Sequence, residues 1–468
     1  MTAPVEAQSA RARALGLRLL AVALSAGALF GVSIAAMNQT VEQVRLEFAL
    51  SSLRQGFVVS GLVAGALLGC LAAGALTDRL GRRQMLTAAG VLGSGAASLC
   101  VVAPDQDVLF VGRLLLGFAV GVTSAVGPVL LAELAAARWR GVLITTYQLA
   151  LTAGVMVAFT VGVTVHPGHN WRLMFVVNAL PAVALAVTTL LIPLSPEDLM
   201  ARGEHDRARA VLAATREPAE ARAEWAALRS DRDRRSKSAL RGLFDPSLRL
   251  PVAIALGAGL MNALVGIGVV AYYSTLVFDA AGIRSGSGAE IATLSVAAVN
   301  LVASVVAVGL INRYGRRPLL TVGLAGIAVS MAAAGVALTA AGKPVTGPLT
   351  VAAMLVFITC FAFSAGPLAW VLIAEVLPSE VRARVAGSAL ACNWGANLLV
   401  ALLFPVVVHT PAIGYRVGLV FLLFAALSLT FLYLVRRLVP ETKDRTLAEL
   451  EAVLTARSRQ QDPAGGGP

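Results

Sequence analysis

The chain has 468 residues, of which 57% are hydrophobic and 14% are charged, and its mean hydropathy is +0.79. A soluble domain carries about 45–50% apolar and about 25% charged residues, so this composition excludes a soluble enzyme and a secreted disulfide scaffold. The formal net charge of +12 is typical either of nucleic-acid binding or of basic loops beside a membrane, and the distribution of the basic residues decides between the two.

Apolar segments of about twenty residues recur along the chain, a length that suits helices crossing a hydrocarbon layer about 30 Å thick. They lack the period-two alternation of a membrane β-barrel. We therefore predict an all-α membrane protein with twelve transmembrane helices, near residues 15–37, 56–77, 85–102, 108–131, 143–165, 172–193, 250–278, 291–311, 319–341, 349–373, 386–408 and 416–438.

The basic residues gather in alternate loops. With the amino terminus inside, most of the 38 Lys and Arg residues face the cytoplasm; Arg113 lies within a span, and the residues outside are Arg45, Arg54, Arg172, Arg284, Lys343 and Arg416. This pattern follows the positive-inside rule. We expect a multi-pass protein of the plasma membrane, with the lipid bilayer around it, both termini in the cytoplasm and no nucleic-acid partner. The excess of Arg over Lys is consistent with a high-GC bacterial genome.

The chain divides into two similar halves. Asp78-Arg79-Leu80-Gly81-Arg82-Arg83 returns half a chain later as Asn312-Arg313-Tyr314-Gly315-Arg316-Arg317, and Glu133 with Arg140 returns as Glu375 with Arg382. Parallel repeats of six helices build one large class of transporters. We predict an N-terminal six-helix bundle over 1–193, a cytoplasmic linker with short helices over 194–249, a C-terminal bundle over 250–440 and a cytoplasmic tail over 441–468. Within the linker, a helix is expected near Asp206 to Ala214.

Several motifs occur in a fixed order: Gly74-Ala75-Leu76-Thr77-Asp78-Arg79-Leu80-Gly81-Arg82-Arg83, Gly112-Arg113-Leu114-Leu115-Leu116-Gly117-Phe118-Ala119-Val120-Gly121, Pro128-Val129-Leu130-Leu131-Ala132-Glu133-Leu134, Gly366-Pro367-Leu368-Ala369-Trp370, Asn393-Trp394-Gly395-Ala396-Asn397 and Pro440-Glu441-Thr442-Lys443. Over nearly its whole length the chain resembles the major facilitator superfamily and, within it, the sugar porter family. The resemblance implies two pseudo-symmetric six-helix bundles, a central solute site near the middle of the bilayer and transport by alternating access. It implies no enzyme activity and no cofactor.

The resemblance also implies a gate of charged residues at the cytoplasmic ends of the helices. The expected gating residues are Asp78, Arg82, Glu133, Arg140, Arg316, Glu375 and Arg382. Arginine suits this role because its planar fork of donors holds a carboxylate in two places. Exposed ion pairs contribute only about 0–1 kcal/mol each, which suits a gate that must open. The alternative is that these arginines only set the topology.

The same resemblance suggests residues that bind the solute. These are Gln148, Asn262, Asn300, Trp370, Asn393 and Trp394. An amide both donates and accepts hydrogen bonds to hydroxyls, and an indole offers a flat face to a sugar ring. The alternatives are a bond between helices for Gln148 and simple packing for Trp370. Span seven departs from the family because Ala263 and Gly268 replace polar residues, so we expect a less polar pocket than one for hexoses.

Energy coupling depends on the first span. Proton-coupled sugar porters place an Asp after a Phe-Gly-Tyr-like stretch, whereas here Phe30-Gly31-Val32 leads to Ser33, and the acidic residues of the predicted spans lie only near helix ends. A serine hydroxyl neither gains nor loses a charge near neutral pH and so cannot carry a coupling proton, and we therefore predict facilitated diffusion. The deep charge of Arg113 is costly unless it faces polar groups or solute; with Ser33, it completes the expected solute-binding residues.

We therefore predict a monomeric uniporter of a small polar solute, a sugar or polyol. Arg113 and the depleted span seven leave a second reading open, in which the protein carries an organic acid or an amphipathic compound by proton coupling or exchange. A third reading is a sensor that binds solute without moving it. The sequence shows no Walker-type Gly-Lys-Ser/Thr that would indicate ATP-driven transport.

Overall fold

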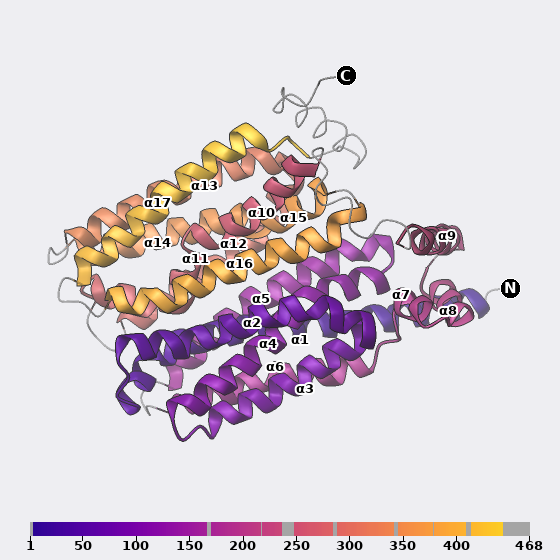
Figure 1. Ribbon diagram of the computed structural model, residues 1–468, viewed down its shortest axis with the longest axis horizontal. Coiled ribbons are helices and arrows are strands. Elements are labelled where there is room, and N and C mark those ends of the chain that lie inside the picture. Colours follow the sequence, from indigo (N-terminus) through magenta and orange to yellow (C-terminus); the bar gives the residue numbers. More distant parts are fainter. Residues whose placement is uncertain are drawn as a thin grey trace. The chain divides into compact units, whose positions relative to one another are not determined.

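The computed structural model describes residues 3–165, 170–216, 218–235, 248–283, 288–340, 345–377, 379–408 and 413–442. These residues form α-helices and their connections (Figure 1). Twelve helical segments are long and apolar enough to cross a membrane, as the sequence predicts. In the first half the helices are α1 (Ala3–Glu47), α2 (Ser52–Leu80), α3 (Arg82–Val101), α4 (Gln106–Leu134), α5 (Ala137–Val165), α6 (Arg172–Leu190), α7 (Pro196–Ala201), α8 (His205–Thr215) and α9 (Pro218–Arg235).

The second half contains another series of helices. They are α10 (Arg249–Leu264), α11 (Ile267–Ala280), α12 (Gly288–Tyr314), α13 (Arg316–Thr339), α14 (Thr346–Phe363), α15 (Ala365–Val376), α16 (Ser379–Val408) and α17 (Ile413–Leu438). The chain forms two compact units: unit 1 comprises Met1–Gln43 and Gly61–Lys237, and unit 2 comprises Val44–Ser60 and Ser238–Pro468. The boundaries of bundles, linker and tail given above stay predictions.

Small residues bring the helices of unit 1 into close contact. A Cβ atom on Gly65 of α2 would lie 1.9 Å from the carbonyl oxygen of Leu114 on α4, and one on Gly31 of α1 would lie 2.0 Å from that of Leu151 on α5. Lipid provides no hydrophobic force between helices, so such close packing holds membrane bundles together. These contacts fix α1 beside α5 and α2 beside α4.

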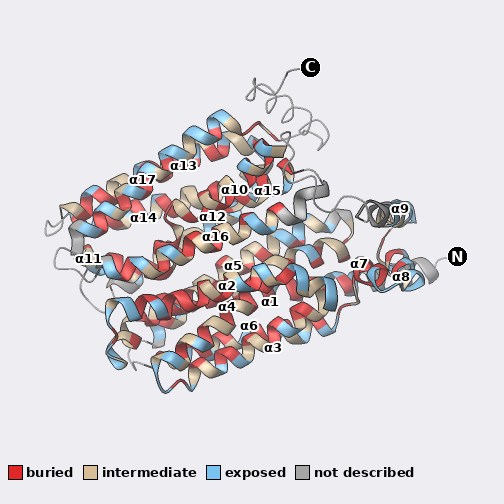
Figure 2. Cartoon of the chain, viewed as in Figure 1, coloured by how far each residue is buried: buried red, intermediate tan, exposed pale blue. Residues whose placement is uncertain are grey.

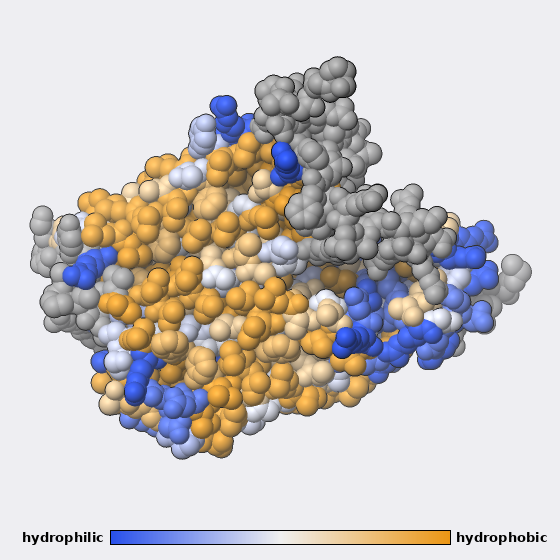
Figure 3. All heavy atoms as spheres, in the orientation of Figure 1, coloured by the Kyte–Doolittle hydropathy of each residue, from blue (hydrophilic) through white to orange (hydrophobic). Residues whose placement is uncertain are grey.

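The outward faces of the spans are apolar. Buried residues follow the inner side of each bundle, and exposed residues follow the outer side (Figure 2). The exposed set includes large side chains such as Val91, Leu180, Val329 and Leu423, and the visible surface of the helices is largely hydrophobic (Figure 3). An apolar surface of this kind is unfavourable in water and favourable in a lipid bilayer, as expected for helices that span a membrane.

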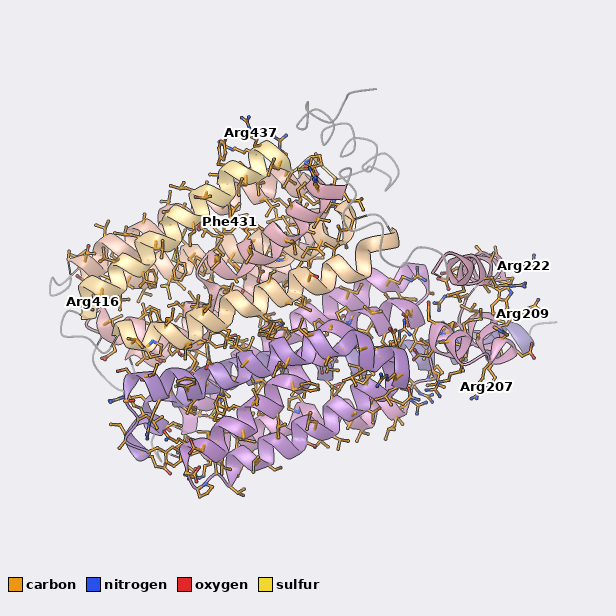
Figure 4. All side chains as sticks on the ribbon, viewed as in Figure 1. Arg207, Arg209, Arg222, Arg416, Phe431 and Arg437 are labelled. Atoms are coloured by element: carbon orange, nitrogen blue, oxygen red, sulfur yellow. The ribbon has the colours of Figure 1, made fainter. Side chains whose placement is uncertain are left out.

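The linker forms a small polar subdomain in unit 1. Its helix α8 (His205–Thr215) confirms the helix expected near Asp206 to Ala214. Leu199, Met200 and Ala208 form a small core under α7 and α8. Arg207, Arg209 and Arg222 extend outward from α8 and α9 (Figure 4), so the outer side of these helices is charged, unlike that of the spans.

Two predicted spans of unit 2 are broken helices. Segment 250–278 divides at Gly266, where φ is +104°, and segment 349–373 divides at Ser364, with φ −126° and ψ −100°. Glycine adopts a positive φ without a Cβ clash, so Gly266 suits this break. A break frees backbone polar groups, which a membrane protein tolerates only where they are buried in protein or line a cavity. The predicted spans 250–278 and 349–373 are present, and each is built from two helices, a division that hydropathy does not register.

Candidate functional site

Ser33 lies fully buried on α1, at the position where proton-coupled sugar porters are expected to carry an acid. Its Oγ donates to Oδ1 of Asn178 on α6 over 2.9 Å. Asn178 is also fully buried, and its Nδ2 has no hydrogen-bond partner in the described part of the chain. Neither side chain gains or loses a proton near neutral pH, so this contact is a neutral one. Asn178 was not singled out from the sequence, although an amide in an apolar span is itself a signal.

Two other expected solute-binding residues belong to unit 1. Arg113 lies on α4 with no exposed surface, so its guanidinium is directed into the unit, as the cost of a charge facing lipid requires. Gln148 is half-buried on α5, the helix that Gly31 brings against α1. Ser33, Arg113 and Gln148 therefore come from three helices of one bundle.

Unit 2 contains a cluster of amides. Nδ2 of Asn262, near the end of α10, donates to the carbonyl oxygens of Ala365 (3.0 Å) and Gly366 (3.3 Å). Nδ2 of Asn393 on α16 donates to Oδ1 of Asn262 over 2.9 Å. Asn262 precedes the break at Gly266, and Ala365 follows the break at Ser364, so this amide connects the two broken spans.

The cluster extends one turn further along α16. Nδ2 of Asn397 donates to the carbonyl oxygen of Asn393 over 3.0 Å, and a Cβ on Gly268 would lie 2.8 Å from Oδ1 of Asn397. Asn397 was missed among the predicted site residues, although its spacing of four residues from Asn393 places both on one helix face. Trp394, the residue after Asn393, is buried. Asn300 on α12 and Trp370 on α15 are half-buried.

The charged contacts of unit 1 lie around the turn at Gly81, where φ is +91°. Asp198 accepts from the backbone N–H of Arg82 and from its Nη1, both over 2.8 Å. Nε of Arg82 lies 3.3 Å from Oε1 of Glu133 at the end of α4. Arg82 thus bridges two carboxylates, and the Asp198 side chain is 1% exposed. Asp198 was not among the expected gating residues, although it follows the exit of the sixth span.

A second group of contacts joins the linker to the end of α4. Arg140, an expected gating residue, forms an ion pair with Glu224 of α9. Arg216 shares that carboxylate over 2.9 Å and donates to the carbonyl oxygens of Glu133 (2.7 Å) and Leu134 (2.9 Å). Burial, followed by the nearby Arg140 charge, lowers the pKa of Arg216 from its ordinary value. A guanidinium at free carbonyls stabilises a helix C-terminus, so the linker secures α4.

Unit 2 repeats the arrangement around Gly315, where φ is +84°. Glu441 accepts the backbone N–H groups of Arg316 (3.0 Å) and Arg317 (3.1 Å). Nη2 of Arg316 lies 2.9 Å from Oε1 of Glu375, whose Oε2 accepts from Oγ1 of Thr442 over 2.5 Å. In each unit an acid after the last span holds the Gly-Arg turn, and a Glu pairs with its arginine. Glu441 was quoted in a motif but not expected in the gate.

Two expected gating residues lie outside these contacts. Asp78 is exposed at the end of α2 and takes no part in them. The side chain of Arg382 lies outside the described residues. The structure thus brings together Arg82 with Glu133, and Arg316 with Glu375, and it pairs Arg140 of α5 with Glu224 of the linker.

Known proteins are similar to this chain in sequence and in architecture. The family described as "Sugar (and other) transporter" matches residues 19–454. The galactose-proton symporter of Escherichia coli (strain K12) is 32% identical over 434 residues, which cover 92% of each chain. The D-xylose transporter of Levilactobacillus brevis is 29% identical over 437 residues, covering 92% of this chain and 94% of its own.

A solved structure of a proton:xylose symporter bound to 6-bromo-6-deoxy-D-glucose is similar with a TM-score of 0.79 and 27% identity, covering 95% of this chain and 100% of that one. The relatives are transporters rather than enzymes. The chain is a multi-pass membrane protein that belongs to the sugar transporter family of the major facilitator superfamily.

Proposed function

We propose that this transporter carries a sugar or polyol by alternating access, as a monomer and without coupling to protons. The observation that carries the choice of solute is the buried amide cluster of Asn262, Asn393 and Asn397 beside the broken spans. Amides exchange donors and acceptors with hydroxyl groups, and two of these three match expected solute-binding positions. The galactose and xylose named for the relatives support a sugar.

The amide cluster also limits how many hydroxyls the site engages. Asn262 and Asn393 already bond to each other and to backbone carbonyls, so a solute hydroxyl replaces one of these bonds rather than meeting a free group. Gly268 offers no side chain beside Asn397, and Ala263 offers no polar atom. We expect a preference for solutes with fewer hydroxyls than a hexose, such as pentoses or deoxysugars.

The contact between Ser33 and Asn178 supports transport without proton coupling. Their contact is neutral, and in the described part of the chain the acidic residues of the spans lie near helix ends. A coupling proton needs a titratable group that meets both sides in turn. The relatives named as proton symporters favour the opposite reading, so coupling is the first property to test.

The gate that we propose has one half in each unit. Arg82 with Glu133 and Asp198 forms the first half, and Arg316 with Glu375 and Glu441 forms the second. Arg140 acts through Glu224 on the linker, and Asp78 and Arg382 stay proposed members. With both termini in the cytoplasm of the cell membrane, as the basic loops favour, these contacts lie on the cytoplasmic side.

The experiment is uptake of labelled D-xylose, D-galactose and a 6-deoxyhexose into proteoliposomes, with and without an imposed pH gradient. We expect equilibration without accumulation, unchanged by the gradient, and weaker uptake by Gln148→Ala and Asn393→Ala. A matched control is Gln39→Ala in α1, which alters an amide outside the expected solute-binding positions. Accumulation driven by the gradient would overturn the uncoupled mechanism, and binding without counterflow would favour a sensor.

A second candidate rests on the fully buried Arg113. A guanidinium inside the membrane suits a carboxylate on the solute. An organic-acid carrier would be favoured if the wild type takes up an aromatic carboxylate and no sugar. The Arg113→Gln variant should then lose uptake of the carboxylate.

A further inference from the structure

A groove with a volume of about 580 Å³ lies along α3 in unit 1, beside Leu190 at the end of α6 and Leu194 after it. Arg83, Gln84 and Thr87, from the first turns of α3, line one end, and Val91 and Leu92 continue the lining along the same helix. The groove is therefore polar at the end of the span and apolar toward its middle. This is the order of groups in a phospholipid, from headgroup to acyl chain.

The groove opens on the face of unit 1 that carries exposed apolar side chains. Val91 is 60% exposed and Leu190 57% exposed. The neighbouring turns of α6 also expose Leu180, Val183 and Val187. Because both helices are membrane spans, lipid rather than water meets this face.

One guanidinium, that of Arg83, lines the polar end of the groove, while Arg18 and Arg202 lie outside the lining and bond to backbone carbonyls near it. Nη2 of Arg83 donates to the carbonyl oxygen of Leu190 over 3.2 Å, and Nη1 of Arg18 donates to that of Leu191 over 3.1 Å. Nη2 of Arg202 donates to the carbonyl oxygen of Leu80 over 2.9 Å. Each guanidinium has five N–H donors, so one bond to a carbonyl leaves others for a ligand.

The nearby acid does not neutralise this group of arginines. Asp198 is occupied by the backbone and guanidinium of Arg82, and the residues that line the groove include Arg83 and no acid. The hydroxyl of Thr87 is within 2.9 Å of that of Thr189, and the amide of Gln84 is engaged by the carbonyl oxygen of Leu80 and by Nη2 of Arg202, which leaves Arg83 as the polar group of the lining that meets the ligand. The charge of the site therefore complements an anion.

We propose that this groove binds an anionic phospholipid, with the phosphate on Arg83 and an acyl chain along Val91 and Leu92. Arginine binds phosphate through paired N–H groups, and anionic lipids attract basic residues at the membrane surface. The site rests on α3 and α6 being membrane spans and not on the identity of the solute. With the proposed orientation, the lipid belongs to the cytoplasmic leaflet.

Lipid binding here is linked to the gate. Arg83 follows Arg82, the residue that joins Asp198 and Glu133, in the first turn of α3. A ligand that binds only when this turn is in place stabilises the same turn by mass action. The bound lipid therefore favours the state in which the contacts of Arg82 are formed.

The test is native mass spectrometry of the full-length protein in detergent, titrated with phosphatidylglycerol or phosphatidylcholine of identical acyl chains. We expect one phosphatidylglycerol to bind more tightly than phosphatidylcholine. Arg83→Gln is expected to weaken the affinity for phosphatidylglycerol about fivefold, because a basic residue near an anionic lipid contributes about 1 kcal/mol. Ala88→Trp, which fills the exposed groove, is expected to weaken binding of the same lipid without removing a charge.

Arg317→Gln is the matched control. Arg317 holds the equivalent motif position in unit 2 and donates to the carbonyl oxygen of Arg436 over 2.6 Å, so the variant removes the same charge elsewhere. It is expected to leave the affinity within twofold. The proposal would be overturned by equal affinity for the two lipids or by an equal loss of affinity in Arg317→Gln. It would also be overturned if Ala88→Trp had no effect, or if soluble glycerol phosphate displaced the lipid at the lipid's own concentration. Solute uptake is measured separately, in vesicles of phosphatidylcholine alone. Uptake to equilibrium there shows that the protein transports its solute even where the lipid proposal fails.

Discussion

Asp198 accepts two hydrogen bonds of 2.8 Å from Arg82, one from its backbone N–H and one from its guanidinium. Glu441 receives the backbone N–H groups of Arg316 and Arg317 in the same way. Arg82 begins α3 and Arg316 begins α13, so each acid supplies negative charge and an acceptor at a helix N-terminus, where both are favourable. In each unit, an acid that follows the last span thus stabilises the N-terminus of another span, α3 in unit 1 and α13 in unit 2.

Replacing Asp198 with Asn is expected to lower the free energy of unfolding by about 1.5–3 kcal/mol, because hydrogen bonds to a charged group are lost in a buried place. Thermal unfolding in detergent measures the change. Asp206→Asn, on the exposed side of α8, is the control and is expected to change much less. Equal effects of the two substitutions would show that Asp198 does not secure α3.

Glu197 predicts a pH dependence of stability. Burial raises the pKa of this carboxyl, and Asp198 raises it further, while Arg82 and Arg216 oppose them. The folded protein therefore holds the proton more tightly than the unfolded chain, whose Glu has a pKa of about 4.3. The stabilisation is complete below that value and is lost as pH rises through the raised pKa.

Glu197→Gln keeps the side chain neutral at every pH. We expect its melting temperature to fall less than that of the wild type as pH rises from about 4.3 to 8. Melting curves of both proteins across that range provide the measurement. Parallel curves would contradict the expected role of Glu197.

The amide pair of Asn262 and Asn393 predicts a coupling energy. Each single substitution to Ala removes the 2.9 Å bond between the amides, so the double variant is expected to lose less stability than the sum of the two. A difference of about 0.5–3 kcal/mol is typical of residues in one network. A double-mutant cycle on unfolding measures it, and strict additivity would show that the two amides act independently.

Gly266 predicts a local conformational cost. With φ at +104°, an added Cβ would lie 3.0 Å from Cε of Met331 and 3.1 Å from Cδ2 of Phe424. Gly266→Ala is therefore expected to cost about 1–2 kcal/mol from the left-handed backbone alone. On α10, a Cβ added to Gly257 would meet no atom within 4 Å, and Gly257→Ala is expected to be neutral or stabilising by about 0.5–1 kcal/mol. Unfolding of the two variants compares them directly.

The membrane architecture was predictable because it depends on the length and apolarity of segments. Twelve spans follow from hydropathy, and the repeated Gly-Arg turns at Gly81 and Gly315 follow from the motif that recurs in each half. The pairing of Arg82 with Glu133 joins residues of two motifs that the resemblance had already linked to the gate.

The remaining features depend on geometry that composition does not record. The break at Ser364 is a matter of backbone angles in an otherwise apolar run. Asp198 lies beyond the sixth span, outside the motifs quoted from the sequence, so its contact with Arg82 was not predicted. The bond between Ser33 and Asn178 joins two helices that are far apart in sequence, and only the packed bundle brings them together.

Uncoupled transport depends most on the neutral contact of Ser33 with Asn178. The direct measurement is the internal pH of proteoliposomes, followed with a trapped dye, when a transported sugar is added without a pre-existing gradient. We predict that sugar enters while internal pH stays constant, whereas a known proton:xylose symporter acidifies the lumen in the same assay. Acidification by this protein that follows the amount of sugar transported would contradict an uncoupled mechanism.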